Sequence, residues 1–145
     1  MLRLLTVGRG YTVQIGNTEK VQFTGSLNNN TQTISGLTYA AAGTSGSASA
    51  GWALIGNPYP APLDWRTVGT ATGSSLNGVD GAAYVFQSTG AYSGRYTSFT
   101  NNVGAGTGLI ASGQGFFVRA STPGTTGSIT LTNANRVTSY ASRVF

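Results

Sequence analysis

The 145-residue sequence has no cysteine and no histidine, and only three of its residues are acidic. Without cysteine the chain forms no disulfide bond and has no thiolate nucleophile. Without histidine it has neither a Ser-His-Asp nor a Cys-His catalytic arrangement. The usual zinc ligands are missing for the same reason. These absences exclude most familiar catalytic chemistry, and no cofactor is expected.

Charge is also scarce. Charged residues make up 8% of the chain against about 25% in an average protein, while hydrophobic residues reach 39%, so the chain is expected to fold. The net charge of +5 comes from dispersed cations, whereas nucleic-acid binders usually concentrate them on one face or segment. No apolar run approaches the roughly 20 residues needed to cross a bilayer. Neither a nucleic-acid partner nor a membrane span is expected.

The sequence is rich in β-strand patterns. Short runs of Val, Ile, Thr, Tyr and Phe alternate with Gly, Asn and Ser clusters at intervals of about 8 to 12 residues, the spacing of a sandwich or barrel. The pattern predicts an all-β, antiparallel two-sheet β-sandwich, jelly-roll-like or Ig-like, with residues 1–145 as a single domain. The predicted strands are residues 9–15, 20–24, 31–37, 51–57, 82–88, 92–97, 115–120 and 127–132.

The intervening segments also carry local signals. Residues 27–30 and 88–91 have the composition of hairpin turns. Residues 40–50 are nearly all Ala, Gly, Ser and Thr and are predicted to form a loop. Asp64 has the side chain of a helix N-cap, so one short helical turn is expected after it, and no other helix.

The most specific string is Gly-Trp-Ala-Leu-Ile-Gly-Asn-Pro-Tyr-Pro-Ala-Pro-Leu-Asp-Trp, residues 51–65. Its first part, residues 52–55, is predicted to belong to a buried strand. Each of its prolines then restricts its own φ and the conformation of the preceding residue, which forces an extended, rigid exit. The chain is expected to turn a corner there.

Two interpretations of this corner remain open. In one, Trp52, Tyr59 and Trp65 offer a flat aromatic platform to a sugar, with Asn57 and Asp64 as hydrogen-bonding neighbours. In the other, the tryptophans fill the core while the two polar side chains tie the corner to the sheet. The second is favoured, because large aromatic residues in a short β domain are usually buried. It predicts that Trp52 is a core residue.

A second motif, Gly-Gln-Gly-Phe-Phe-Val at residues 113–118, opens a predicted strand. Strand alternation places Phe116 and Val118 on one face and Phe117 on the other. Gln114, between two glycines, either marks the start of a buried strand or binds a ligand at the edge of the sheet.

An enzyme would have to work with three carboxylates. Glu19 lies in a predicted exposed turn, so Asp64 and Asp80 are the only pair that a glycosidase could use as acid and base. Residues 77–81 could offer oxygen ligands to calcium, but one carboxylate among amides is a poor donor set. No metal site is expected.

Residues 51–65, together with the strings at residues 84–86, 90–96, 110–118 and 131–136, resemble a β-rich domain that recurs in very large secreted or surface proteins of Bacteroidota. There it tends to stand just upstream of a type IX secretion sorting domain. The resemblance implies an extracellular or cell-surface location and a module that is a fragment of a longer polypeptide. It supplies no catalytic residues.

The resulting expectation is a non-catalytic module that binds carbohydrate or mediates adhesion, with Trp65, Tyr59, Asn57 and Gln114 as candidate ligand-binding residues. Its partners are glycans or neighbouring domains of the same polypeptide. The alternative is a small glycan-active hydrolase that uses Asp64 and Asp80.

Overall fold

The computed structural model describes residues 5–13, 16, 18–43, 51–101, 103–104 and 106–139. Its elements in chain order are β1 (Gln32–Thr38), β2 (Trp52–Gly56), β3 (Leu63–Asp64), the 3-10 helix η2 (Trp65–Thr67), β4 (Ser75–Asn77), β5 (Ala82–Gly90), β6 (Ser93–Thr100), β7 (Val103–Gly104), β8 (Leu109–Ile110), β9 (Gly115–Arg119), β10 (Thr126–Leu131) and the 3-10 helix η3 (Asn133–Asn135). None of the described helices is long and apolar enough to span a membrane.

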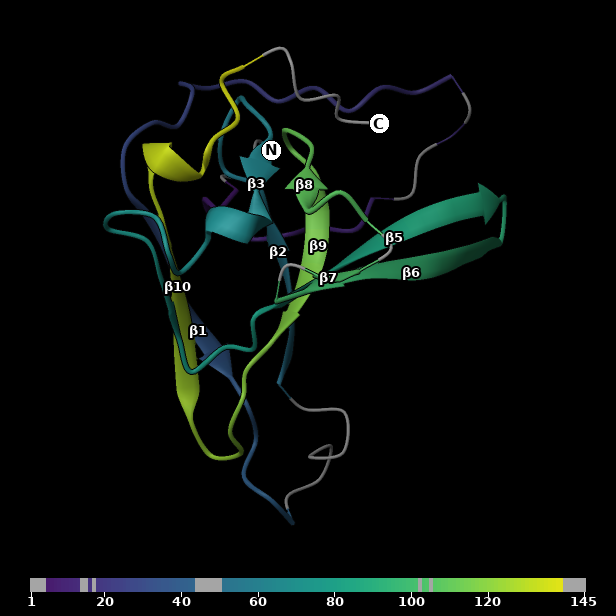
Figure 1. The fold of residues 1–145 in the computed structure, drawn as a ribbon. Helices are drawn as coiled ribbons and strands as arrows, with labels where there is room; N and C mark the ends of the chain where they lie inside the picture. Colours follow the sequence, from purple (N-terminus) through teal and green to yellow (C-terminus); the bar gives the residue numbers. More distant parts are fainter. Residues whose placement is uncertain are drawn as a thin grey trace.

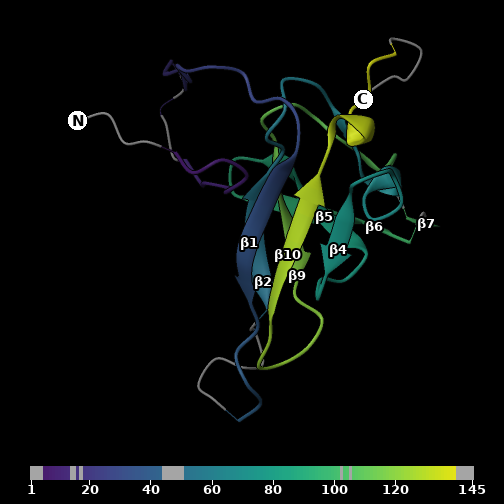
Figure 2. The same cartoon turned by 90° about the vertical axis from the view of Figure 1, so that its left-hand side faces the viewer.

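The strands form three antiparallel sheets. A five-stranded sheet has the order β2-β9-β5-β6-β7, a three-stranded sheet has the order β1-β10-β4, and β3 pairs with β8. Figure 2 shows the three-stranded sheet in front of strands of the five-stranded one. The predicted all-β antiparallel sandwich is therefore confirmed.

The core lies between the sheets and follows strand alternation. In β9 the side chains of Phe116 and Val118 are buried, and that of Phe117 points to the opposite face, as predicted. In β10 the alternate residues Ile129 and Leu131 are fully buried. Strand β9 of the five-stranded sheet and strand β10 of the three-stranded sheet thus each turn one face toward the core.

Six of the eight predicted strands are present with small shifts, as β1, β2, β5, β6, β9 and β10. The strands predicted at residues 9–15 and 20–24 are wrong. Within them the structure shows only an isolated bridge from Arg9 to Ile55, and residues 14 and 15 lie outside the described part. Val13 and Phe23 are 59% and 72% exposed, so these apolar side chains have no packed layer to hold the segments as strands.

Some of the predicted turns are present in the structure and others are not. Asp64 caps η2 as expected, its Oδ1 accepting the Arg66 backbone N–H, whereas η3 was missed. Asn30 has a φ of 61°, but residues 27–30 join no hairpin, because the described residues before them contain no strand. The β5–β6 hairpin exists, with its turn beyond Gly90, which pairs with Ser93. Of the loop predicted at residues 40–50, only 40–43 are described, and none of these lies in a strand.

The β5–β6 hairpin reaches away from the packed sheets as an arm (Figure 1). Strand β9 pairs with β5 at Tyr84 alone, and β7 pairs with β6 only at Phe99 and Thr100. The outer part of the arm therefore has no neighbouring strand in the described structure.

Candidate functional site

The proline corner is organised by the buried side chain of Asn57. Its Nδ2 donates to the carbonyl oxygens of Ala61, Ile110 and Ala111 at 2.9, 3.2 and 3.0 Å, and its Oδ1 accepts the Tyr59 backbone N–H at 3.0 Å. A buried amide that is fully hydrogen-bonded fixes the backbone around it. Asn57 thus ties the corner to the segment at residues 110–111.

Tyr59 extends these connections to the segment before β1 and to the residue after η3. Its hydroxyl donates to the Asn30 carbonyl oxygen at 2.7 Å, and the Arg136 guanidinium lies 5.6 Å from the centre of its ring. Burial raises the pKa of Tyr59, and the positive charge of Arg136 partly opposes that rise. The tyrosine is 2% exposed and has no face free for a ligand.

Trp65 is 4% exposed. Its ring packs edge-on against Phe116 with centroids 5.4 Å apart, and its Nε1–H donates to the Gly81 carbonyl oxygen. The exposed platform proposed for Tyr59 and Trp65 is therefore wrong, since both rings belong to the core. The structural interpretation of the corner holds for these residues and for Asn57.

The candidate catalytic pair has other partners. Asp64 receives two hydrogen bonds from the Arg66 guanidinium, at 2.7 and 2.6 Å, and this interaction raises the pKa of Arg66. Asp80 donates its backbone N–H to the Arg119 carbonyl oxygen. In the part of the chain that the structure describes, neither carboxylate lines the cleft described below.

A row of aromatic side chains covers the outer face of the five-stranded sheet. We call it the aromatic face, and its members are Trp52, Tyr84, Phe86, Tyr96 and Phe117. The register explains why they share one side: Tyr84 pairs with Phe117, and Phe86 pairs with Tyr96. Residues directly opposite in neighbouring strands point to the same face.

The rings form two contacting groups, Trp52 with Tyr84 and Phe117 with Tyr96 and Phe86, which the pairing of Tyr84 with Phe117 places side by side. Centroid distances are 4.9 Å from Trp52 to Tyr84, 5.8 Å from Phe117 to Tyr96 and 5.3 Å from Tyr96 to Phe86, each with an edge-to-face geometry. Such pairs are mutually stabilising. Trp52, Phe86 and Tyr96 nevertheless remain 45%, 50% and 58% exposed, so the row faces solvent.

Arg119 closes one end of this row. Its guanidinium lies 5.9 Å from the centre of the Trp52 ring and 5.3 Å from that of Tyr39, and it donates to the Tyr39 hydroxyl at 2.9 Å. A cation held against two rings is positioned rather than mobile.

A glycine allows the packing at the other end. A Cβ placed on Gly94 would lie 2.1 Å from Cζ of Phe86. Without that Cβ, the Phe86 ring lies over the backbone of β6 beside Tyr96. The outward aromatic surface of the arm is thus built into the strand sequence.

Sequence reasoning assigned Trp52 to the core, and that assignment is wrong. The residue begins β2 on the face opposite Ile55, which is buried. A signal was present in the consecutive apolar runs at residues 84–86 and 116–118. An antiparallel strand with one solvated face should alternate with polar residues, so apolar side chains on both faces indicate a second, exposed apolar surface.

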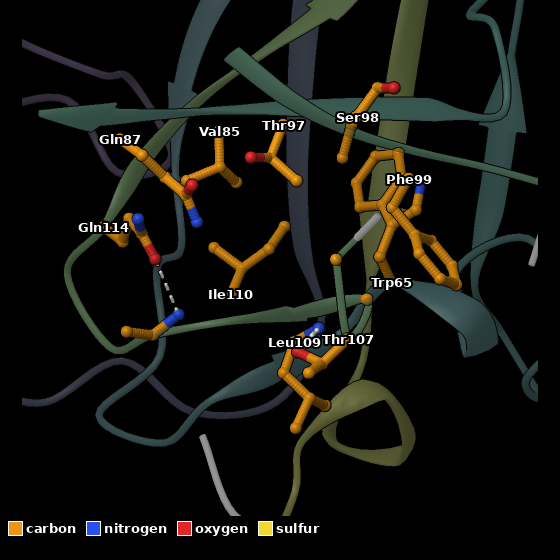
Figure 3. Close-up of a pocket in the computed structure, with 14 residues that line it drawn as sticks. Trp65, Val85, Gln87, Thr97, Ser98, Phe99, Thr107, Leu109, Ile110 and Gln114 are labelled. Carbon is orange, nitrogen blue, oxygen red and sulfur yellow. Dashed lines mark hydrogen bonds between the residues drawn. The ribbon is translucent and has the colours of Figure 1, made fainter. Parts of the chain in front are cut away.

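The opposite face of the arm borders a cleft of about 280 Å³. Its walls are the inner face of β5 and β6 and the segment at residues 106–111. Figure 3 shows Gln87 and Gln114 at one end and Trp65 and Phe99 at the other. Gln114 thus lies at a ligand-sized space, as one interpretation of its motif proposed, while its Oε1 accepts the Ala111 backbone N–H at 3.1 Å.

Comparison with curated proteins and with solved structures gives no match. A family model described as a domain of unknown function, DUF8693, matches residues 3–145. Because that match covers nearly the whole chain, the protein belongs to the DUF8693 family.

Proposed function

We propose that this chain is a non-catalytic carbohydrate-binding module whose binding surface is the aromatic face. One observation carries the proposal: Trp52, Phe86 and Tyr96 lie in a single row on a sheet and keep 45 to 58% of their surface exposed. A row of exposed rings is an apolar surface that a soluble protein rarely leaves uncovered without a partner.

The chemistry of the row suits a sugar chain. The C–H faces of a pyranose pack on aromatic rings, and the hydroxyls of Tyr84 and Tyr96 and the guanidinium of Arg119 can hydrogen-bond the sugar hydroxyls. Neighbouring strands lie about 4.8 Å apart, a step comparable with the length of one sugar unit. Since the rings are fixed by the sheet and by each other, binding orders few side chains.

We place the module outside the cell or on its surface, as part of a longer protein. This location rests on the resemblance of residues 51–65 and of the later motifs to the Bacteroidota surface domain. Through such a module, a surface protein would bind a glycan and thereby mediate adhesion.

The proposal is tested by screening the purified chain on a glycan array and measuring the best ligand by calorimetry. Trp52→Ala and Phe86→Ala should each weaken binding about tenfold, since one ring contact is worth roughly 1 to 1.5 kcal/mol. Phe23→Ala is the matched control, because Phe23 is 72% exposed and lies on the segment before β1. Its affinity should equal that of the wild type.

The double variant Asp64→Asn with Asp80→Asn separates this proposal from the hydrolase. Binding should persist in that variant, and the wild type should release no product from the bound glycan. Turnover that disappears in the double variant while the fold is preserved would establish the enzyme instead. Failure of every glycan to bind, or binding that is indifferent to Trp52→Ala and Phe86→Ala, would reject the aromatic face as a sugar site.

A further inference from the structure

The cleft on the inner face of the arm is separate from the aromatic face. Alternate residues of β5 point to opposite sides, so Val85 and Gln87 face the cleft while Tyr84 and Phe86 face outward. The volume of about 280 Å³ is close to the lower limit of about 300 Å³ for small-molecule sites. A single ring with a small substituent fits such a space better than a long chain does.

The lining of the cleft combines polar and apolar side chains and carries no charge. Among the described residues that line it there is no Asp, Glu, Lys or Arg. This composition disfavours phosphate, carboxylate and ammonium ligands, whose charge would be desolvated without a counter-charge. The ligand that the lining suits is therefore neutral and hydrogen-bonding.

Two glutamine amides at one end of the cleft have free hydrogen-bonding groups. Gln114 uses its Oε1 to accept from Ala111, which orients its Nε2 group and leaves both of its hydrogens without a partner in the described structure. Gln87 is exposed, and neither end of its amide has a described partner. The pair thus presents N–H donors from both residues and an acceptor oxygen from Gln87.

An apolar surface lies directly beside these amides. Figure 3 shows Val85 and Ile110 pointing into the space between the two walls, with the Thr97 side chain next to them. The Thr107 hydroxyl accepts the Leu109 N–H and keeps its own hydrogen to donate. Amide groups, a small apolar surface and hydroxyls therefore occur together in one uncharged cleft.

We infer that this cleft binds one N-acetylated hexosamine residue through its acetamido group. The acetamido carbonyl would accept from Nε2 of Gln114, its N–H would donate to Oε1 of Gln87, and its methyl would contact Val85 and Ile110. The hydroxyls of Thr97 and Thr107 would meet the ring hydroxyls. This inference extends the proposed function by a second sugar site, and it uses no residue of the aromatic face.

The experiment is an NMR titration of the full 145-residue chain with N-acetylglucosamine. We expect saturable shifts of the Gln87 and Gln114 side-chain NH₂ signals and of the amides at Thr97 and Thr107. Glucose, which lacks the acetamido group, and glucosamine, which carries a charged amine instead, should bind at least about tenfold more weakly, because the hydrogen bonds to the two glutamine amides and the methyl contact would be lost.

The variants separate this site from the aromatic face. Gln87→Ala and Thr97→Val should each weaken binding of N-acetylglucosamine several-fold, whereas Gln22→Ala, a matched change at an exposed position before β1, and Trp52→Ala should not. Gln87 is exposed and Thr97→Val keeps the shape of the side chain, so both variants should fold.

Absence of shifts at the cleft, equal shifts with glucose, or tighter binding of an N-acetylated dipeptide would each overturn the inference. Shifts confined to Trp52 and Tyr96 would reject the cleft and retain the aromatic face. Shifts at the cleft alone would support the inference, and the aromatic face would then be tested separately by the glycan array and by Trp52→Ala and Phe86→Ala.

Discussion

The two tryptophans of the chain lie at opposite ends of one string and have opposite environments. Trp52 starts the string on the outer face of β2 with 45% of its surface exposed, and Trp65 ends it in the core with 4% exposed. Between them the proline corner takes the chain from the sheet into the interior. In a strand, the pleat decides whether an aromatic side chain is buried or exposed. After the proline corner, its environment depends instead on the direction in which the corner turns the chain.

The largest expected effect is therefore the difference between two identical substitutions. Trp65→Ala should lower the free energy of unfolding by about 3 to 5 kcal/mol, because it removes a buried ring and leaves a cavity. Trp52→Ala should lower it by only about 1 to 2 kcal/mol, since half of that ring already faces water. Urea unfolding of the two variants beside the wild type measures both values.

Equal losses of unfolding free energy in the two variants would show that Trp52 is as much a core residue as Trp65. A Trp52 variant that also loses the near-ultraviolet signal of the core would point the same way. A loss of stability confined to Trp65→Ala would show that only Trp65 contributes to the core.

Local sequence patterns explain the longer strands but not the whole fold. The six longer strands are short runs rich in β-branched and aromatic residues and are bounded by turn residues, so their presence was predictable. Strands β3 and β8, with two residues each, have no periodicity to detect. The segments at residues 9–15 and 20–24 do alternate, but a strand needs a partner edge and a packed face, and those depend on the rest of the fold.

The functional sites, like the strands, could be predicted from the sequence only in part. In the string at residues 51–65, Asn57 does bond to the backbone across the corner, as the structural interpretation expected, whereas Asp64 bonds to the neighbouring Arg66 instead of tying the corner to the sheet. Apart from Trp52, the side chains of the string that the structure places serve the architecture, and the other exposed rings, Phe86 and Tyr96, are on strands that looked like ordinary core strands. The pairing of Tyr84 with Phe117 and of Phe86 with Tyr96 arises from sheet order, which no single strand encodes.

The second prediction tests whether polar side chains at the corner are as essential as its rings. Asn57→Ala should lower the free energy of unfolding by about 2 to 4 kcal/mol, because it leaves several buried or partly buried backbone groups without their hydrogen bonds. Asn77→Ala is the control: Asn77 is exposed and its one described side-chain hydrogen bond is 3.5 Å long, so the change should cost less than about 0.5 kcal/mol. Similar values for the two variants would show that the corner does not depend on Asn57.

The smallest predicted effect concerns Tyr59, whose ring is in the core while its hydroxyl holds the segment before β1. Tyr59→Phe keeps the ring and removes the hydrogen bond to the Asn30 carbonyl oxygen, so the cost at neutral pH should be about 1 kcal/mol. Denaturant titration at pH 7 measures it. A cost as large as that of Trp65→Ala would mean that the phenyl ring alone does not maintain the packing.

The pH dependence of the same variant is a separate check. Because burial raises the pKa of Tyr59, the folded chain keeps this proton above the pH of about 10 at which an unfolded tyrosine loses it. The stability that Tyr59 contributes is complete below pH 10 and is lost as the pH rises through the raised pKa. Tyr59→Phe should therefore lose less stability than the wild type over that window.

Tyr11→Phe is a control of opposite sign, since the hydrogen bond from the Thr6 N–H lowers the pKa of Tyr11. Identical alkaline profiles of the wild type and Tyr59→Phe would contradict the assignment of the buried proton to Tyr59.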